Sequence, residues 1–289
     1  DGIYVDGTLG GAGHSSRIAA KLTTGRLIGI DRDEIALAAA ARRLEPYKDR
    51  VTLVHSNFCE IASVLKQLHI DGVDGVLLDL GVSSPQLDDG SRGFSYMADA
   101  PLDMRMDNTD TLTAATVVNT WPYEELKRIL YDYGEERYAP QIASAICRKR
   151  EQKPIATTLE LVDVIRSAMP PAALREKQHP AKRSFQAIRI AVNDELGAVE
   201  KVMRDAVPCL NPGGRLAVIT FHSLEDRIVK NAMAEAAKGC TCPPDFPVCV
   251  CGKKPKVKLI TRKPIVSGDE ELEVNPRARS AKLRICEKL

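Results

Sequence analysis

The chain has 289 residues, of which 44% are hydrophobic and 28% are charged. This composition excludes wholesale disorder, and no apolar run is long enough for a transmembrane helix, so we expect one large or two modest domains and no membrane partner. No basic, apolar leader marks the chain for secretion. The chain opens at Asp1 almost directly on a strand-like run, so we expect its natural N-terminus to be missing.

The net charge of +2 conceals an uneven distribution. Residues 140–189 carry 10 Lys and Arg against 4 Asp and Glu, and residues 253–289 carry 11 against 5, which leaves the rest of the chain acidic. Two basic segments on an acidic body indicate an anionic partner such as nucleic acid. Solvated surface faces would explain the same counts.

The first forty residues predict one half of a nucleotide-binding sheet. The apolar run 3–5 ends at Asp6, a turn with four glycines follows, and a helical pattern occupies residues 16–22. A second apolar run, 26–30, ends at Asp31. Strand, glycine turn, helix, strand and acid together are typical of a doubly wound, Rossmann-like α/β fold. The glycines let a ligand approach the backbone, and the acid can accept hydrogen bonds from ribose hydroxyls.

The glycine turn leaves two cofactors open. Residues 11–16 approximate the dinucleotide fingerprint, so an NAD-dependent dehydrogenase is one interpretation. However, Asp6 would repel a pyrophosphate and suit a cationic ligand, and His14 stands where a dinucleotide needs a bare helix start. The residues therefore favour S-adenosylmethionine, which carries a sulfonium, an amino group and no phosphate. The alternative for Asp6 is that it only ends a strand and caps the turn.

Further strands are predicted at residues 50–55, 75–80 and 215–221, with a helix over 195–210 before the last of them. Phe58, after the third strand, is either a stacking partner for adenine or a core residue. The stretch between the fourth and fifth strands is too long for a loop. We expect residues 105–199 to form an inserted helical subdomain for substrate recognition, so that the methyltransferase domain comprises 1–104 and 200–289. Thr157 and Glu160 predict a helix capping box within the insertion.

Polar residues follow the fourth strand, which ends at Asp79. Reacting groups in doubly wound sheets lie beyond the carboxyl ends of the strands. A carboxylate, a serine hydroxyl and a proline-constrained carbonyl can hold the N–H groups of an amine so that its lone pair points at a methyl donor. Ser83, Ser84 and Pro85 are therefore candidate contacts for a target amine. The structural alternative is a strand-end acid followed by a serine turn.

The chain resembles the RsmH (MraW) family of bacterial 16S ribosomal RNA cytosine-N4 methyltransferases. The matching stretches span nearly the whole chain: 6–15, 79–89, 92–96, 101–107, 133–137, 179–195, 221–230 and 275–284. The resemblance implies S-adenosylmethionine as cofactor, 16S rRNA in the small ribosomal subunit as partner, and a cytidine of the decoding region as methyl acceptor. It leaves open a monomer or a homodimer. An RNA-binding or ribosome-assembly factor without activity is the competing functional class.

The resemblance also implies particular cofactor contacts. Asp31 would bind the ribose, Phe58 would flank the adenine, and Asp79 and Gln86 would close the methionine side. The complete set of implied contacts is Ala12, Gly13, His14, Asp31, Phe58, Asp79 and Gln86. Phe94 or Tyr96 would supply stacking on the target base.

Basic residues are expected to hold RNA phosphates, which would make binding fall steeply with salt. One group lies on a predicted amphipathic helix and comprises Lys182, Arg183 and Arg189. The other lies in the C-terminal segment and comprises Lys253, Lys254, Lys256, Arg262, Arg277 and Arg279.

Four cysteines, Cys240, Cys242, Cys249 and Cys251, form the pattern C-x-C-x6-C-x-C. Four nearby thiols suggest structural zinc, but an extended C-x-C separates its sulfurs awkwardly for one tetrahedron. A loop with reduced thiols, or disulfides formed on storage, is the alternative, and we assign no metal from the sequence. His222 near Glu225 and Asp226 imitates a metal or hydrolase site, but a strand-end and helix-capping role is favoured.

Overall fold

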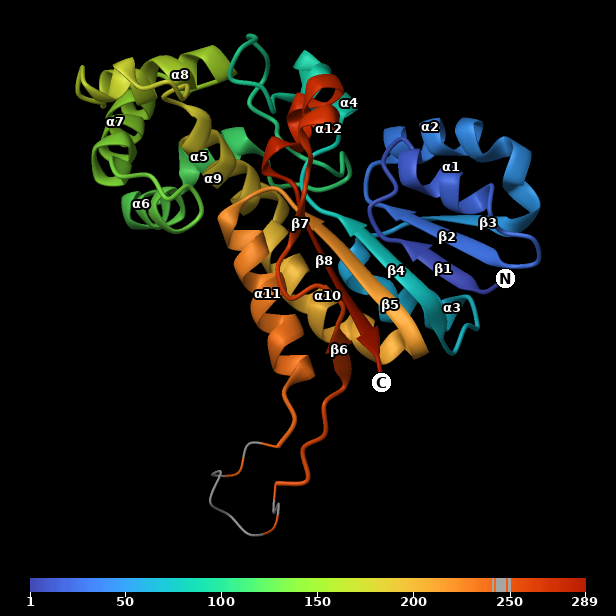
Figure 1. Ribbon diagram of the computed structural model, residues 1–289. Helices are drawn as coiled ribbons and strands as arrows, with labels where there is room; N and C mark the ends of the chain where they lie inside the picture. The colour runs from blue at the N-terminus through green and yellow to red at the C-terminus, as the bar shows by residue number, and fades with distance from the viewer. Residues whose placement is uncertain (241, 243–247, 249–250) are drawn as a thin grey trace. The chain divides into compact units, whose positions relative to one another are not determined.

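The computed structural model describes residues 1–240, 242, 248 and 251–289 (Figure 1). Two compact units are present: Asp1–Gly81 together with Leu196–Leu289, and Val82–Glu195. Within the described part of the chain, no helix has both the length and the apolar character needed to cross a membrane.

The first unit is built on an eight-stranded sheet in which the strands follow the order β3-β2-β1-β4-β5-β8-β6, and β7 pairs with β8. The five strands from β3 to β5 are parallel, and the chain reverses its direction of travel across the sheet between β1 and β4. This topology confirms the predicted doubly wound sheet. The parallel strands are β1 (Ile3–Asp6), β2 (Arg26–Asp31), β3 (Val51–His55), β4 (Val73–Asp79) and β5 (Leu210–Thr220).

Antiparallel strands extend the sheet beyond β5. β8 (Lys282–Lys288) pairs along β5, and both β6 (Val257–Leu259) and β7 (Ile265–Val266) pair with β8. The C-terminal part of the chain therefore completes the sheet, and part of its basic segment is strand rather than a free tail.

Helices cover both faces of the sheet, as a doubly wound fold requires. One apolar cluster joins strand residues such as Ile28 and Leu78 to α3, α10 and α11. The other joins Leu27 to α1 and α2. The helices of this unit are α1 (Gly13–Ala19), α2 (Glu34–Leu44), α3 (Ile61–Gln67), α10 (Glu195–Cys209), α11 (Ser223–Ala237) and α12 (Asp269–Val274). α10 confirms the helix predicted over 195–210.

The second unit is helical and has its own apolar core, in the region where the sequence predicts a helical insertion. Its helices are α4 (Ser84–Asp88), α5 (Ala114–Thr120), α6 (Tyr123–Asp132), α7 (Ala139–Gln152), α8 (Thr158–Ser167) and α9 (Lys182–Asn193). The predicted capping box begins α8: the Glu160 N–H donates to Thr157 Oγ1, and the Thr157 N–H donates to Glu160 Oε2, each at 3.3 Å.

The second unit starts earlier than the insertion expected at residues 105–199. It begins at Val82 and ends at Glu195. Phe94, Leu102 and Met104 are buried in the helical core, so the segment after β4 packs with the helices rather than with the sheet.

Candidate functional site

The glycine turn after β1 lies over the carboxyl ends of three neighbouring strands. The Gly7 N–H donates to the Leu77 carbonyl of β4 at 2.9 Å, and the Leu9 N–H donates to the Ile30 carbonyl of β2 at 3.1 Å. Ala12 precedes α1 with a φ of 58°, a left-handed conformation uncommon for alanine, and is fully buried. The sheet thus fixes the turn on both sides.

Asp6 is the internal anchor of this turn. Its side chain is 1% exposed, and its carboxylate accepts hydrogen bonds from Ser15 Oγ at 2.7 Å and from the Thr8 N–H at 3.2 Å. Burial raises the pKa of Asp6, although both hydrogen bonds oppose this shift. Of the two roles considered from the sequence, the structure therefore supports the strand-end cap rather than a direct ligand contact.

Asp31 ties the tip of β2 to the same turn. Its Oδ2 accepts the Gly10 N–H at 2.7 Å and its Oδ1 accepts the Asp33 N–H at 2.9 Å. Burial raises the pKa of this carboxyl. Because each carboxylate oxygen has a second lone pair, Asp31 retains acceptor capacity beside the turn. Its expected contact with a ribose stays a prediction.

Asp79 presents one unsatisfied carboxylate oxygen at the end of β4. Its N–H donates to Thr8 Oγ1 at 2.6 Å, which fixes the strand end against the turn. Its Oδ1 is buried and accepts no hydrogen bond from any residue that the structure describes. A buried carboxylate oxygen without a donor is costly, so this atom is suited to a ligand that brings a cation or an N–H group. Thr8 had no role in the sequence analysis; its position in the glycine turn was the only signal.

His14 lies next to Asp79 at the start of α1. Its Nε2 is 3.6 Å from Asp79 Oδ2, and its side chain is 53% exposed. The Asp79 carboxylate raises the pKa of His14, against a smaller opposing effect of burial. The turn and the two strand ends thus bring His14, Asp31 and Asp79 of the predicted contacts to one edge of the sheet.

The turn also leaves its backbone accessible. A Cβ added at Gly11 or at Gly13 would meet no described atom within 4 Å. A bare backbone beside an unsatisfied carboxylate fits a ligand that carries positive charge and needs close approach, as S-adenosylmethionine does. The same carboxylate would oppose a pyrophosphate, so this edge fits a dinucleotide less well.

The interaction between His14 and Asp79 gives a pH prediction. The pKa of His14 is raised in the folded chain. The contribution of protonated His14 to the stability of the fold is therefore fully present below pH 6.5 and is lost as the pH rises through the raised pKa. Replacing Asp79 with asparagine should lower the pKa of His14, which NMR titration of the imidazole C–H signals measures. An unchanged titration of His14 in Asp79→Asn would contradict this electrostatic coupling.

Phe58 follows β3 and opens a short 3-10 turn, Phe58–Glu60. Its side chain is partly buried and packs against the core of the first unit. Both interpretations of Phe58 therefore remain, and its contact with adenine stays a prediction.

The predicted residues after Gly81 belong to the second unit. Ser83 caps α4: the Gln86 N–H approaches Ser83 Oγ at 3.4 Å, and the Ser83 N–H donates to Gln86 Oε1 at 3.0 Å. Gln86 is buried, whereas Ser84 and Pro85 are exposed. The serine turn is thus a helix start, and the target-amine and cofactor roles of these residues stay predictions.

The two aromatic candidates for base stacking differ in their surroundings. Phe94 is 6% exposed and belongs to the helical core, so the structure gives it a packing role. Tyr96 stacks on His179, with ring centroids 4.5 Å apart and an angle of 17° between the planes. Phe185 meets the Tyr96 ring edge-on at 5.7 Å. Only Tyr96 remains a candidate for base stacking, with its ring already paired to His179.

The basic helix α9 is less available to phosphate than its charges suggest. Arg189 forms a bidentate ion pair with Glu195, at 2.8 and 2.9 Å, in which both side chains are largely buried. Arg183 donates to the Glu135 carbonyl at 2.7 Å, whereas Lys182 is exposed. Arg189 is therefore held in an internal ion pair with an acid six residues further along, and its expected contact with RNA phosphate stays a prediction.

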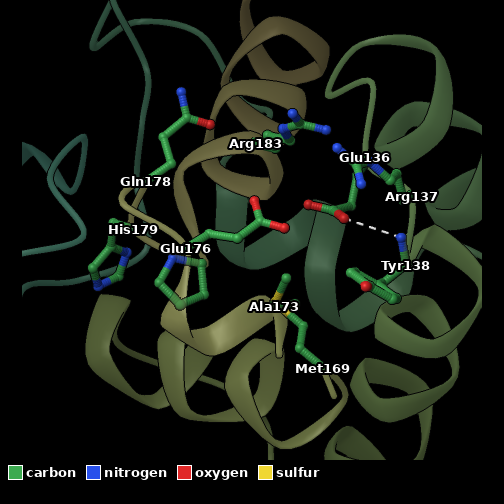
Figure 2. A pocket seen from close by; sticks show the side chains of 10 residues that line it. Glu136, Arg137, Tyr138, Met169, Ala173, Glu176, Gln178, His179 and Arg183 are labelled. Atoms are coloured by element: carbon green, nitrogen blue, oxygen red, sulfur yellow. Dashed lines mark hydrogen bonds between the residues drawn. The ribbon is translucent and has the colours of Figure 1, made fainter. Parts of the chain in front are cut away.

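An open hollow lies in the second unit. Figure 2 shows the carboxylates of Glu136 and Glu176 directed toward one another, with Arg183 on the neighbouring helix. Glu136 is buried and its Oε1 accepts the Tyr138 N–H at 3.0 Å. The hollow offers both acceptors and donors. No role was predicted for its lining, although parts of that lining lie within the matching stretches 133–137 and 179–195.

The His222 region has the favoured structural role. The Glu225 carboxylate accepts the N–H groups of Phe221 and His222, at 3.0 and 3.4 Å, and so caps α11. Asp226 forms an ion pair with Arg284 of β8, with its closest contact at 2.7 Å. These contacts account for the acids without a catalytic role.

Comparison with known proteins gives a whole-chain match. A family model described as the MraW methylase family matches residues 1–289. A protein of Heliobacterium modesticaldum named Ribosomal RNA small subunit methyltransferase H is 60% identical over 291 residues, covering 100% of this chain and 93% of that protein. The protein of the same name from Brevibacillus brevis is 61% identical over 289 residues, covering 100% and 92%.

Two solved structures of methyltransferases also align with this chain, both with a TM-score below 0.5. A putative rRNA-methylase from Clostridium thermocellum aligns with a TM-score of 0.44 and 12% identity, covering 100% of this chain and 89% of that one. A putative methyltransferase from Streptococcus mutans, solved in complex with SAH, aligns with a TM-score of 0.42 and 12% identity, again covering 100% and 89%.

Proposed function

The chain belongs to the MraW methylase family and is an S-adenosylmethionine-dependent methyltransferase, and we propose that it methylates the exocyclic N4 amine of a cytidine in the decoding region of 16S ribosomal RNA. The observation that carries this proposal is the identity of 60% to 61%, over the full chain, to proteins named Ribosomal RNA small subunit methyltransferase H. The substrate is the RNA of the small ribosomal subunit, and the reaction takes place in the cytoplasm.

The cofactor binds at the edge of the sheet where the glycine turn meets β2 and β4. S-adenosylmethionine supplies an electrophilic methyl group on a sulfonium. Gly11 and Gly13 admit it close to the backbone, and Asp79 provides negative charge for its cationic part. Asp31 accepts hydrogen bonds from the ribose, with its position set by Gly10 and Asp33. Phe58 flanks the adenine.

The target amine needs positioning more than a strong base. The lone pair of a cytosine amine is delocalised into the ring, so the acceptor must be held with its nitrogen aligned toward the methyl group. Ser84 and Pro85 are exposed at the start of α4 and supply a hydroxyl and a constrained carbonyl for this purpose. Ser83 holds the start of that helix through its hydrogen bonds with Gln86.

The RNA must expose its target base before methylation. A cytosine in folded RNA is splayed out of its stack to enter a protein pocket. The inserted helical unit contributes to the RNA-binding surface, with Lys182 as an exposed cation on α9. Binding through phosphates predicts an affinity that falls steeply with salt.

Mass spectrometry of small-subunit RNA tests the proposed function. RNA from cells that lack the protein should contain one cytidine lighter by a methyl group, and expression of the intact chain should restore the mass. Digestion to nucleosides then distinguishes N4 methylation from methylation elsewhere on the base or ribose. Identical RNA masses with and without the protein would reject the proposal and favour an assembly factor without activity.

A further inference from the structure

Three of the four clustered cysteines converge in space between α11 and β6. The Sγ atoms of Cys240, Cys242 and Cys251 all lie within 4.8 Å of one another, and those of Cys240 and Cys251 are 3.6 Å apart. The sequence suggested that C-x-C would keep its sulfurs too far apart, but the described chain brings both together with a third. Cys249 lies outside the described residues.

The sulfur separations fit a thiolate metal site. Tetrahedral zinc with Zn–S bonds near 2.3 Å places its sulfurs about 3.8 Å apart, close to the separation of Cys240 and Cys251. A disulfide would require these two sulfurs to approach to about 2.0 Å. The remaining separations need only small side-chain rotations, because the present upper limit is 4.8 Å.

The local charges also favour thiolates around a cation. The Cys242 N–H points at Cys240 Sγ at 3.4 Å, a contact that stabilises negative charge on sulfur. Three thiolates around Zn²⁺ leave one net negative charge, and the flanking sequence supplies Lys238, Lys253 and Lys254. Zinc suits such a site better than Mg²⁺ or Ca²⁺, which prefer oxygen ligands.

The two ends of the segment that carries the cysteines are held together at its base. The Lys256 N–H donates to the Ala236 carbonyl at 2.8 Å, and Lys253 forms an ion pair with Glu235 of α11. Figure 1 shows the chain leaving the end of α11 and returning into β6. Because these contacts already hold the two ends of the segment together, metal binding by the cysteines costs little additional loop-closure entropy.

We propose that Cys240, Cys242 and Cys251 bind one Zn²⁺ ion through their thiolates. The ion joins the chain just after the end of α11, at Cys240 and Cys242, to the chain just before β6, at Cys251. Its role is structural, since the three thiols lie in the loop between α11 and β6 rather than at the glycine turn, and binding releases the thiol protons. The fourth position is filled by water or by another ligand.

Metal analysis of the full chain tests the proposal. The chain is purified under reducing conditions without chelators or a metal-affinity tag, and its metal content is measured by inductively coupled plasma mass spectrometry. We expect one zinc per chain. Exchange of the zinc for Co²⁺ should produce the visible absorption of a tetrahedral thiolate site. Cys240→Ser and Cys251→Ser should each lower zinc affinity at least about tenfold, measured by competition with a chromophoric chelator.

Cys209→Ser is the matched control, because Cys209 Sγ contacts the Asp205 carbonyl at 3.2 Å and a serine hydroxyl can keep that hydrogen bond. This variant should retain full zinc content. Equal zinc affinity in the intact chain and in Cys240→Ser, with all thiols shown to be reduced by alkylation, would overturn the proposal. So would iron in place of zinc, or a disulfide between Cys240 and Cys251 that persists in reductant.

Discussion

Replacing Asp79 with asparagine is expected to weaken binding of S-adenosylmethionine by roughly 10- to 100-fold and to lower methyl transfer at least as much. Hydrogen bonds to charged groups contribute about 1.5–3 kcal/mol, and each 1.4 kcal/mol corresponds to a factor of ten. The substitution keeps the size of the side chain but removes its charge. The change should not unfold the chain, because Asp79 Oδ1 has no donor among the described residues.

Isothermal titration calorimetry measures the cofactor affinity, and thermal unfolding without cofactor shows whether the fold survives. Asp71→Asn is the matched control, because it makes the same chemical change at an exposed position before β4. Its affinity for the cofactor should equal that of the intact chain. A folded Asp79→Asn variant that binds the cofactor normally would show that this carboxylate does not face the ligand.

Gly13→Ala is expected to leave the fold intact while weakening cofactor binding by about tenfold or more. A Cβ at this position meets no described atom within 4 Å, and alanine is the better helix former at the start of α1. Any loss must therefore come from the added methyl group in the space proposed for the ligand. If the methyl group displaces the cofactor so that one or two of its hydrogen bonds to the backbone are lost, the affinity falls by about the expected amount.

Gly268→Ala supplies the comparison for this change. Its Cβ also meets nothing among the described residues, and its φ of −80° accommodates alanine, but it precedes α12, away from the glycine turn in the sequence. Both variants should unfold at the temperature of the intact chain or slightly above it. Equal cofactor affinity in both variants would place the ligand away from Gly13.

The strand ends were predictable because parallel strands in a doubly wound sheet present their carboxyl ends at one edge. The order of apolar runs and acids was therefore enough to bring the glycine turn, Asp31 and Asp79 together. The role of Asp6 was not predictable in the same way. Its charge suggested a ligand contact, but the side chain turns inward to Ser15, and the sequence carries no signal for that direction.

In the second unit, charge and aromatic character did not suffice to predict ligand contacts, because the sequence does not show which residues a side chain packs against. From its charge alone, Arg189 is a candidate phosphate ligand. In the structure it forms an ion pair with Glu195, which lies close to it because α9 ends at Asn193 and α10 begins at Glu195. Phe94 was a stacking candidate, but it fills the helical core. The expected domain boundary was displaced for the same physical reason, since burial of residues after Gly81 depends on helices that follow much later in the chain.

A crystal structure of the chain with bound S-adenosylmethionine tests the central claim most directly. The account predicts the methionine part of the cofactor against the turn at Gly11 and Gly13, with a cationic group within hydrogen-bonding distance of Asp79 Oδ1 and the ribose at Asp31. Cofactor density at another edge of the sheet, or a phosphorylated ligand seated in that turn, would contradict it.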